Sequence, residues 1–140
     1  MNRAMAKPSP ELLRNVGLFS ALEEKDLTSL ADEFNERRFS PGETIALEGA
    51  GGLMFFVVES GEAAVAVHGD EVGKLGPGDS FGEIALIDRR PRTATVTAKT
   101  DLVTYGLPVF VFRPFVEARP EVAWKLLEQM ADRLNAAEAR

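Results

Sequence analysis

The spacing of apolar residues predicts helices at the N-terminal end of the chain. Apolar residues recur at helical intervals in two stretches: Leu12, Leu13 and Val16, then Leu22, Leu27, Leu30, Ala31 and Phe34. The sequence Ser9-Pro10-Glu11 is typical of a helix start, and Gly17 can end that helix. Ser20 followed by Glu23 has the spacing of a capping box for a second helix. We therefore predict two short helices within residues 9–35, preceded by a flexible leader at residues 1–8.

The pattern changes over residues 36–108, where short apolar runs alternate with turn residues. Strands are expected at 44–47, 54–58, 63–67, 93–98 and 102–107, and Ser60-Gly61 is expected to join two of them as a hairpin. Many short strands with evenly spaced turns favour a small antiparallel barrel or jelly roll.

Residues 109–140 are expected to be helical again. A short helix is predicted at 109–118, broken near Pro114 and stopped by Pro120. A long helix follows at 121–139, with apolar residues at alternating steps of four and three: Ala123, Leu127, Met130, Leu134 and Ala137. This seam fits two readings, a helix that packs on its own barrel and a helix that forms a homodimer. Trp124 on the same helix is expected to pack in the core or in a lid.

The composition fits one soluble domain over residues 9–140. The chain has 140 residues, of which 45% are hydrophobic and 27% charged, and no apolar run has the length of a membrane span or an export signal. We therefore expect a cytoplasmic protein with no membrane partner. The absence of cysteine excludes disulfides and thiolate chemistry, and a single histidine cannot supply a cluster of histidine ligands, so no metal is expected. A net charge of −6 argues against nucleic-acid binding by this chain alone, but leaves a local pocket for a small anion open.

One such pocket is suggested by the stretch FGEIALIDRRPRTATV, residues 81–96. Gly82 permits backbone conformations closed to other residues, and 83–86 can form one helical turn with free N–H groups at its start. A helix start together with the guanidinium of Arg92 would suit a phosphate. The carboxylate of Glu83 beside it would suit a hydroxyl pair, and a sugar phosphate carries both groups. Arg92 and Glu83 could instead be an ordinary surface ion pair and a helix cap.

The same stretch resembles the phosphate-binding cassette of the cyclic nucleotide-binding domains found in kinase regulatory subunits, catabolite activator proteins and gated channels. The matching residues are Phe81, Gly82, Glu83, Ile84, Ala85, Leu86, Pro91, Arg92, Thr93, Ala94, Thr95 and Val96. The flanking strands and terminal helices also match, so the resemblance covers nearly the whole chain. It implies an α+β, mainly β fold: an antiparallel eight-stranded jelly-roll barrel over 36–108, with N-terminal helices at 9–35 and C-terminal helices at 109–140.

The resemblance also implies residue roles. Arg92 would pair with the cyclic phosphate, and Glu83 would accept a hydrogen bond from the ribose 2′-OH. Backbone N–H groups of Ile84, Ala85 and Thr93 would complete the cradle, and Gly82 would let the ribose approach. These residues, with Ala94, form the expected site for cAMP or cGMP. Arg89 and Arg90 would be exposed spacer residues. No cofactor and no catalytic residue are implied, so the chain is expected to be a sensor that moves its C-terminal helix, not an enzyme.

Two departures from the family pattern leave other functions open. Leu53 stands where many members carry an acidic residue that orients the cassette arginine, and Ala136-Ala137-Glu138 replace a hydroxyl pair that reads the base. The chain could therefore be the effector-binding half of a transcription regulator or another multidomain protein, or an interaction module without a ligand. Thr93 permits cGMP as well as cAMP without deciding between them.

Overall fold

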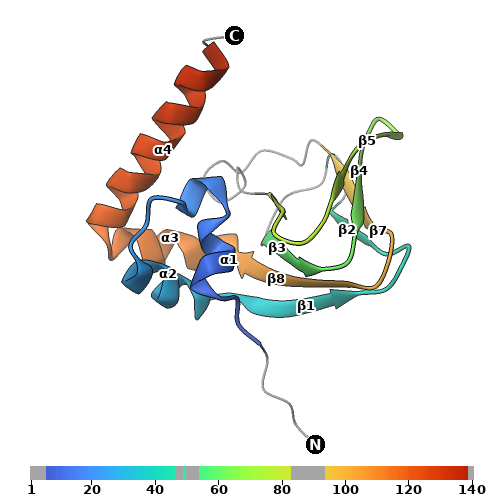
Figure 1. Cartoon of the computed structure of the whole chain (residues 1–140), viewed down its shortest axis with the longest axis horizontal. Coiled ribbons are helices and arrows are strands. Elements are labelled where there is room, and N and C mark those ends of the chain that lie inside the picture. Colours follow the sequence, from blue (N-terminus) through green and yellow to red (C-terminus); the bar gives the residue numbers. More distant parts are fainter. Residues whose placement is uncertain (1–5, 47–48, 50–53, 83–93, 139–140) are drawn as a thin grey trace, which may run out of the picture.

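The fold was analysed in a computed structural model of the chain, which describes residues 6–46, 49, 54–82 and 94–138. The helical elements come before and after the strands in the sequence, but they gather on one side of the molecule with the strands on the other (Figure 1). The helical elements are α1 (Pro10–Arg14), η1 (Gly17–Phe19), α2 (Glu24–Ala31), α3 (Val109–Glu117) and α4 (Pro120–Glu138). The strands are β1 (Asn35–Phe39), β2 (Thr44–Ala46), β3 (Met54–Ser60), β4 (Ala63–Val67), β5 (Asp70–Leu75), β6 (Ser80–Phe81), β7 (Thr95–Ala98) and β8 (Leu102–Pro108).

The strands form two antiparallel sheets. Sheet A has the order β1-β8-β3-β6, and sheet B has the order β2-β7-β4-β5. The expected mainly β fold with eight antiparallel strands and helices at both ends is confirmed. The expected barrel is not closed, because the strand pairs of the described residues leave the two sheets separate.

The predicted hairpin at Ser60-Gly61 is wrong. The strands on either side of it, β3 and β4, pair with other strands and lie in different sheets, so this turn carries the chain from sheet A to sheet B. A hairpin does join β4 to β5, through His68 and Gly69 with φ of 53° and 85°. Positive φ at both turn residues suits the twist of a tight hairpin. A glycine turn between two β-rich runs looks the same in sequence whether the next strand pairs with the last or crosses to the facing sheet.

The N-terminal helices are confirmed, but one predicted cap is not. Ser9 caps α1, where its Oγ accepts a hydrogen bond from the N–H of Leu12 at 3.1 Å. Ser20 instead donates its hydroxyl hydrogen to the carbonyl of Gly17 at 2.9 Å, so it closes the η1 turn rather than starting α2. Gly17 begins η1 and does not end α1, and α2 begins after Glu23, whose side chain makes no capping hydrogen bond.

The predicted break near Pro114 is also wrong, because α3 continues through this residue. Proline removes one backbone donor from a helix and usually kinks it. Phe112 and Phe115, on either side of Pro114, are buried in the main hydrophobic cluster. Their packing holds the helix together where its local sequence would interrupt it.

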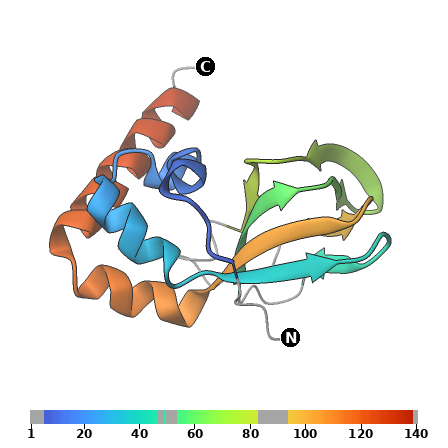
Figure 2. The ribbon, with the colours of Figure 1, turned by 60° about the horizontal axis from the view of Figure 1, so that its bottom comes forward.

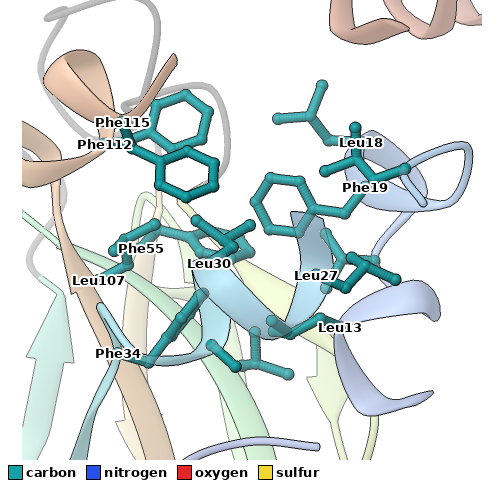
Figure 3. Packing of buried hydrophobic residues seen from close by; sticks show 14 of the residues in the cluster. Leu13, Leu18, Phe19, Leu27, Leu30, Phe34, Phe55, Leu107, Phe112 and Phe115 are labelled. Atoms are coloured by element: carbon teal, nitrogen blue, oxygen red, sulfur yellow. The ribbon is translucent and has the colours of Figure 1, made fainter. Parts of the chain in front are cut away.

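The helices lie together on one side of the strands (Figure 2). The main hydrophobic cluster lies between them and sheet A, and Figure 3 shows its side chains. Phe55 of β3 is at its centre, with the ring of Phe19 at 5.7 Å and the ring of Phe34 at 6.1 Å, both in edge-to-face contact. Ala6 packs against this cluster, and Lys7 donates hydrogen bonds to the carbonyls of Asp32 and Phe34. Contact with the core thus begins inside the segment expected as a leader, while residues 1–5 lie outside the described part.

The long C-terminal helix is docked only through its first half. Val122 and Leu126 are buried in the main cluster, and Met130 packs against it. Leu127 and Leu134, members of the predicted seam, are 58% and 60% exposed. From there α4 extends away from the body of the molecule (Figure 1). Within the described ranges, none of the helices has the length and apolarity needed to cross a lipid bilayer.

Of the two alternatives predicted for Trp124, packing in the core is wrong, and packing in a lid over a ligand stays a prediction. Its side chain is 67% exposed on α4. The docked face of this helix follows the steps Val122, Leu126 and Met130, a row that leaves Trp124 on another side.

Candidate functional site

The structure describes both ends of the predicted binding segment. Gly82 and Ala94 are described and half-buried. Glu83, Ile84, Ala85, Arg92 and Thr93 lie outside the described residues. The same holds for Leu53 and the spacer residues Arg89 and Arg90, so the expected roles of these side chains stay predictions. The structure therefore describes the stretches on either side of the segment, residues 76–82 and 94–98, which we call the frame of the site.

A tight turn precedes the segment. The N–H of Asp79 donates to the carbonyl of Gly76 at 3.0 Å, and Gly78 has φ of 88°. Pro77 before a glycine with positive φ is typical of a type II turn. The carboxylate of Asp79 accepts a second hydrogen bond from the N–H of Gly76 at 2.8 Å. The Pro77-Gly78 pair and the Asp79 carboxylate together fix the conformation of this turn.

Strand β3 holds the turn and the strand after it. The N–H of Val58 donates to the carbonyl of Asp79 at 2.8 Å, and the N–H of Gly78 donates to the carbonyl of Val58 at 2.9 Å. In β6, Ser80 pairs with Val57 and Phe81 pairs with Phe56. These contacts bring the chain along the edge of sheet A to Gly82.

Gly82 has φ of 85°, in the left-handed region that side chains other than glycine rarely adopt. The glycine in FGE is needed here for backbone conformation, in addition to any role in approach of a ligand.

The other end of the segment is held in sheet B. Ala94 leads into β7, which lies between β2 and β4. Val96 is paired with both Ala46 and Val65. Residues 83–93 thus connect the edge of one sheet to an inner strand of the facing sheet.

A second hydrophobic cluster lines the space between the two sheets. Its buried members are Ala46, Val58, Ala63, Val96, Ala98 and Leu102, with Phe39, Ile45, Val65, Leu75 and Phe81 half-buried against them. Small alanine side chains make up half of the buried set. These residues carry no charge, and the charged residues proposed to bind an anion lie in the segment 83–93.

Among the described residues, two side chains on the strands of sheet A have a shifted pKa. Burial raises the pKa of Tyr105, and the nearby carboxylates of Glu59 and Glu36 act in the same direction. Tyr105 belongs to the main cluster on the helix side of sheet A. A hydrogen bond to Glu36 raises the pKa of Arg38, which is on β1.

Comparison with known proteins agrees with this architecture. The family model described as the cyclic nucleotide-binding domain matches residues 36–119. The chain belongs to the cyclic nucleotide-binding domain family. The matched range contains both sheets, the frame at residues 76–82 and 94–98, and α3.

Individual relatives place this domain in larger proteins. The chain is 44% identical over 92 residues to a cAMP-dependent protein kinase regulatory subunit of Yarrowia lipolytica, a match that covers 64% of this chain and 24% of that protein. The N-terminal domain of a transcriptional regulator from Streptomyces coelicolor A3(2) is similar with a TM-score of 0.83 and 32% identity, over 91% of this chain and 92% of that one. The catabolite activator protein of Thermus thermophilus gives a TM-score of 0.71 and 28% identity, over 88% of this chain and 60% of that one.

Sequence reasoning missed the part that β3 plays in the site. The run Met54–Val58 was predicted as a strand, but nothing in its composition indicates that Phe56, Val57 and Val58 pair with the residues before Gly82. That relation depends on the strand order β8-β3-β6, which brings together segments distant in sequence.

Proposed function

We propose that this chain is a cyclic nucleotide sensor, with cAMP as its ligand and cGMP as a second, weaker one. In this proposal Arg92 neutralises the cyclic phosphate, and Glu83 accepts a hydrogen bond from the ribose 2′-OH. The backbone N–H groups of Ile84, Ala85 and Thr93 complete the phosphate cradle. Ala94 ends the cassette.

The observation that carries the proposal is the frame around the cassette. A near-complete FGE-to-TATV motif begins at Phe81 in β6, next to Gly82 with φ of 85°, and ends in β7, so its two ends belong to the two different sheets. A guanidinium and the N–H groups of a helix start suit a phosphate. The similarity to a cAMP-dependent kinase regulatory subunit supports cAMP as the first choice.

Thr93 bears on the choice of nucleotide. A guanine in the syn orientation would bring its 2-amino group towards the phosphate, where the hydroxyl of Thr93 can accept a hydrogen bond. The same hydroxyl can donate to the phosphate of either nucleotide. Discrimination between the two nucleotides is therefore expected to be modest. Thr93→Ala should weaken cGMP more than cAMP, by about the net worth of one neutral hydrogen bond, 0.5–1.5 kcal/mol.

Calorimetric titration of the full chain with cAMP, cGMP and 5′-AMP tests the proposal. We expect one saturable site for each cyclic nucleotide and much weaker binding of 5′-AMP, whose open phosphate carries an additional charge and a different shape. Absence of saturable heat with both cyclic nucleotides would leave the chain as an interaction module without this ligand.

Helix α4 is proposed as the element that relays binding. Only its first half is docked, through Val122, Leu126 and Met130, so its second half is available to take up another arrangement. A ligand can shift such an equilibrium only by its different affinity for the two arrangements. No residue of this chain is assigned a catalytic role.

A second candidate is the effector-binding half of a transcription regulator that dimerises through α4. It is favoured by the likeness to the N-terminal domain of a Streptomyces transcriptional regulator over nearly the whole of both chains. Exposed Leu127 and Leu134 on α4 would supply the dimer contact. This candidate keeps the same nucleotide site and differs in what the site controls.

A further inference from the structure

The strand that delivers the chain to the cassette is very short. β6 consists of Ser80 and Phe81 at the edge of sheet A, so it pairs with β3 on one side only. The turn before it is held firmly, by two hydrogen bonds to Val58 and by the Asp79 carboxylate. The last contact before Gly82 is the pair Phe56–Phe81.

That last contact is made by side chains as well as by backbone. The rings of Phe56 and Phe81 are stacked, with centroids 5.1 Å apart and 24° between their planes. Phe81 is half-buried against the lining between the sheets, while Phe56 is only 6% exposed. An aromatic pair of this kind is more favourable than its buried area alone would give.

The ring of Phe56 is itself fixed by its neighbours in sheet A. On one side it meets the edge of Phe39 at 6.0 Å and 77°. Gly106 of β8 pairs with Phe56 across the sheet, and a Cβ added there would come within 2.6 Å of Met54 Cε and 3.2 Å of the Phe56 ring. The glycine therefore leaves space that Met54 and Phe56 share.

We propose that Phe56 is a positioning residue for the phosphate-binding cassette. Through its stack on Phe81 it fixes the end of β6 and with it Gly82, which has φ of 85° and is the residue from which the cassette continues. Phe56 contacts no ligand in this account. The inference rests on the proposed function, because only that function makes residues 83–93 a phosphate-binding segment. The packing of Phe56 in β3 against Phe81, the residue before Gly82, does not depend on it.

The competing view is that the stack only stabilises the sheets. The two views are separated by a matched control, because Phe39 packs on the same ring of Phe56 but belongs to β1, at the opposite edge of sheet A from β6. Replacing any of the three phenylalanines by leucine removes an aromatic contact and keeps an apolar side chain. If Phe56 positions the cassette, Phe56→Leu and Phe81→Leu will act on binding, whereas Phe39→Leu will act on stability alone.

The first measurement compares cAMP affinity with the free energy of unfolding in urea for these variants. We expect Phe56→Leu and Phe81→Leu each to weaken cAMP binding by about three- to tenfold, the range that one aromatic pair supports. The double variant is expected to lose hardly more than either single one, because both remove the same contact. Phe39→Leu is expected to change affinity by less than about twofold at a comparable loss of stability. The inference would be overturned if the loss of cAMP affinity were proportional to the loss of unfolding free energy in all three single variants. It would also be overturned if the losses of affinity in Phe56→Leu and Phe81→Leu were additive in the double variant.

The second measurement does not depend on a nucleotide. Amide hydrogen exchange at Phe81 and Gly82 reports how well the end of β6 is held. We expect faster exchange there in Phe56→Leu and unchanged exchange in Phe39→Leu. Equal exchange in the two variants would overturn the positioning role even if the wild-type chain bound no cyclic nucleotide, whereas the expected difference without nucleotide binding would refute only the proposed function.

Discussion

Gly61 lies directly against the backbone of Asp101. A Cβ added to Gly61 would collide with the carbonyl oxygen of Asp101 and come within 3.0 Å of the Cα of Leu102. Gly61 also has φ of 92°. Glycine is therefore needed twice at this crossing from β3 to β4, for conformation and for space.

This relation predicts that Gly61→Ala is much more destabilising than Gly69→Ala. Gly69 has φ of 85°, but no atom lies within 4 Å of its added Cβ, so its substitution carries strain alone, about 1 kcal/mol. Gly61→Ala adds a collision with backbone, for an expected loss of about 2–4 kcal/mol. Urea unfolding of both variants measures the difference. Equal losses would mean that the crossing relaxes without cost.

Tyr105 gives the fold a dependence on alkaline pH. Burial raises its pKa above the ordinary value of about 10, so the folded chain keeps the phenol protonated where the unfolded chain ionises. The unfolded state then binds fewer protons, and stability is fully present below about pH 10 and falls as the pH rises above it. Since Tyr105 is the sole tyrosine, tyrosinate absorbance in the native and the urea-unfolded chain reports it directly.

The Tyr105→Phe variant serves as the control. Its free energy of unfolding should fall less at alkaline pH than that of the unsubstituted chain, because the phenol is gone. The lysines contribute equally to the pH dependence of both proteins. Native and unfolded chains that titrate at the same pH would contradict the assignment.

Local sequence signals predicted elements better than the relations between them. The Ser9 cap, the strand at 63–67 and the long C-terminal helix follow from hydrogen-bonding groups and periodicity within a few residues, and the structure has them. The hairpin at Ser60-Gly61 and the break at Pro114 were wrong because their outcome depends on distant packing. Strand order decides the first, and the burial of Phe112 and Phe115 decides the second.

The candidate site shows the same division. The motif at 81–96 led to the family through its resemblance, and the family match confirms that family, while the roles of its side chains stay predictions. The support of Gly82 by β3 could not be read from the sequence, because Phe56 and Phe81 come together only through the order β8-β3-β6. The apolar seam predicted on α4 does not form a single packing face. Met130 packs against the core, whereas Leu127 and Leu134 are exposed to solvent.

The exposed leucines of α4 predict weak dimerisation. They are seven residues apart and therefore lie on one side of the helix, and the stretch is short for an independent coiled coil. Leu127→Ala with Leu134→Ala should abolish self-association and leave the unfolding free energy of the monomer nearly unchanged. Val122→Ala, on the docked side, should lower that free energy by about 2 kcal/mol. Light scattering over a concentration series, with and without cAMP, is the test. A monomer in both states up to roughly 1 mM would contradict the dimer. A dissociation constant of that size corresponds to an association free energy of only about 4 kcal/mol.

Glu83 predicts recognition of the ribose. The 2′-deoxy analogue of cAMP should bind more weakly than cAMP by about 1.5–3 kcal/mol, the worth of a hydrogen bond to a charged group. In Glu83→Ala the analogue should lose little further affinity, because the acceptor is already gone. The four titrations form a thermodynamic cycle, and independent, additive losses would show that Glu83 does not touch the 2′-OH.

The most direct test of the proposed site is calorimetric titration of Arg92→Ala and Arg89→Ala with cAMP. Both substitutions remove one positive charge from the same short segment, so they change its net charge equally. If Arg92 pairs with a desolvated phosphate, its loss should weaken binding by about 2–5 kcal/mol, on the order of 30-fold to several thousandfold. Arg89→Ala should change affinity by less than about threefold, as expected of an exposed charge. Equal losses in the two variants would contradict the account.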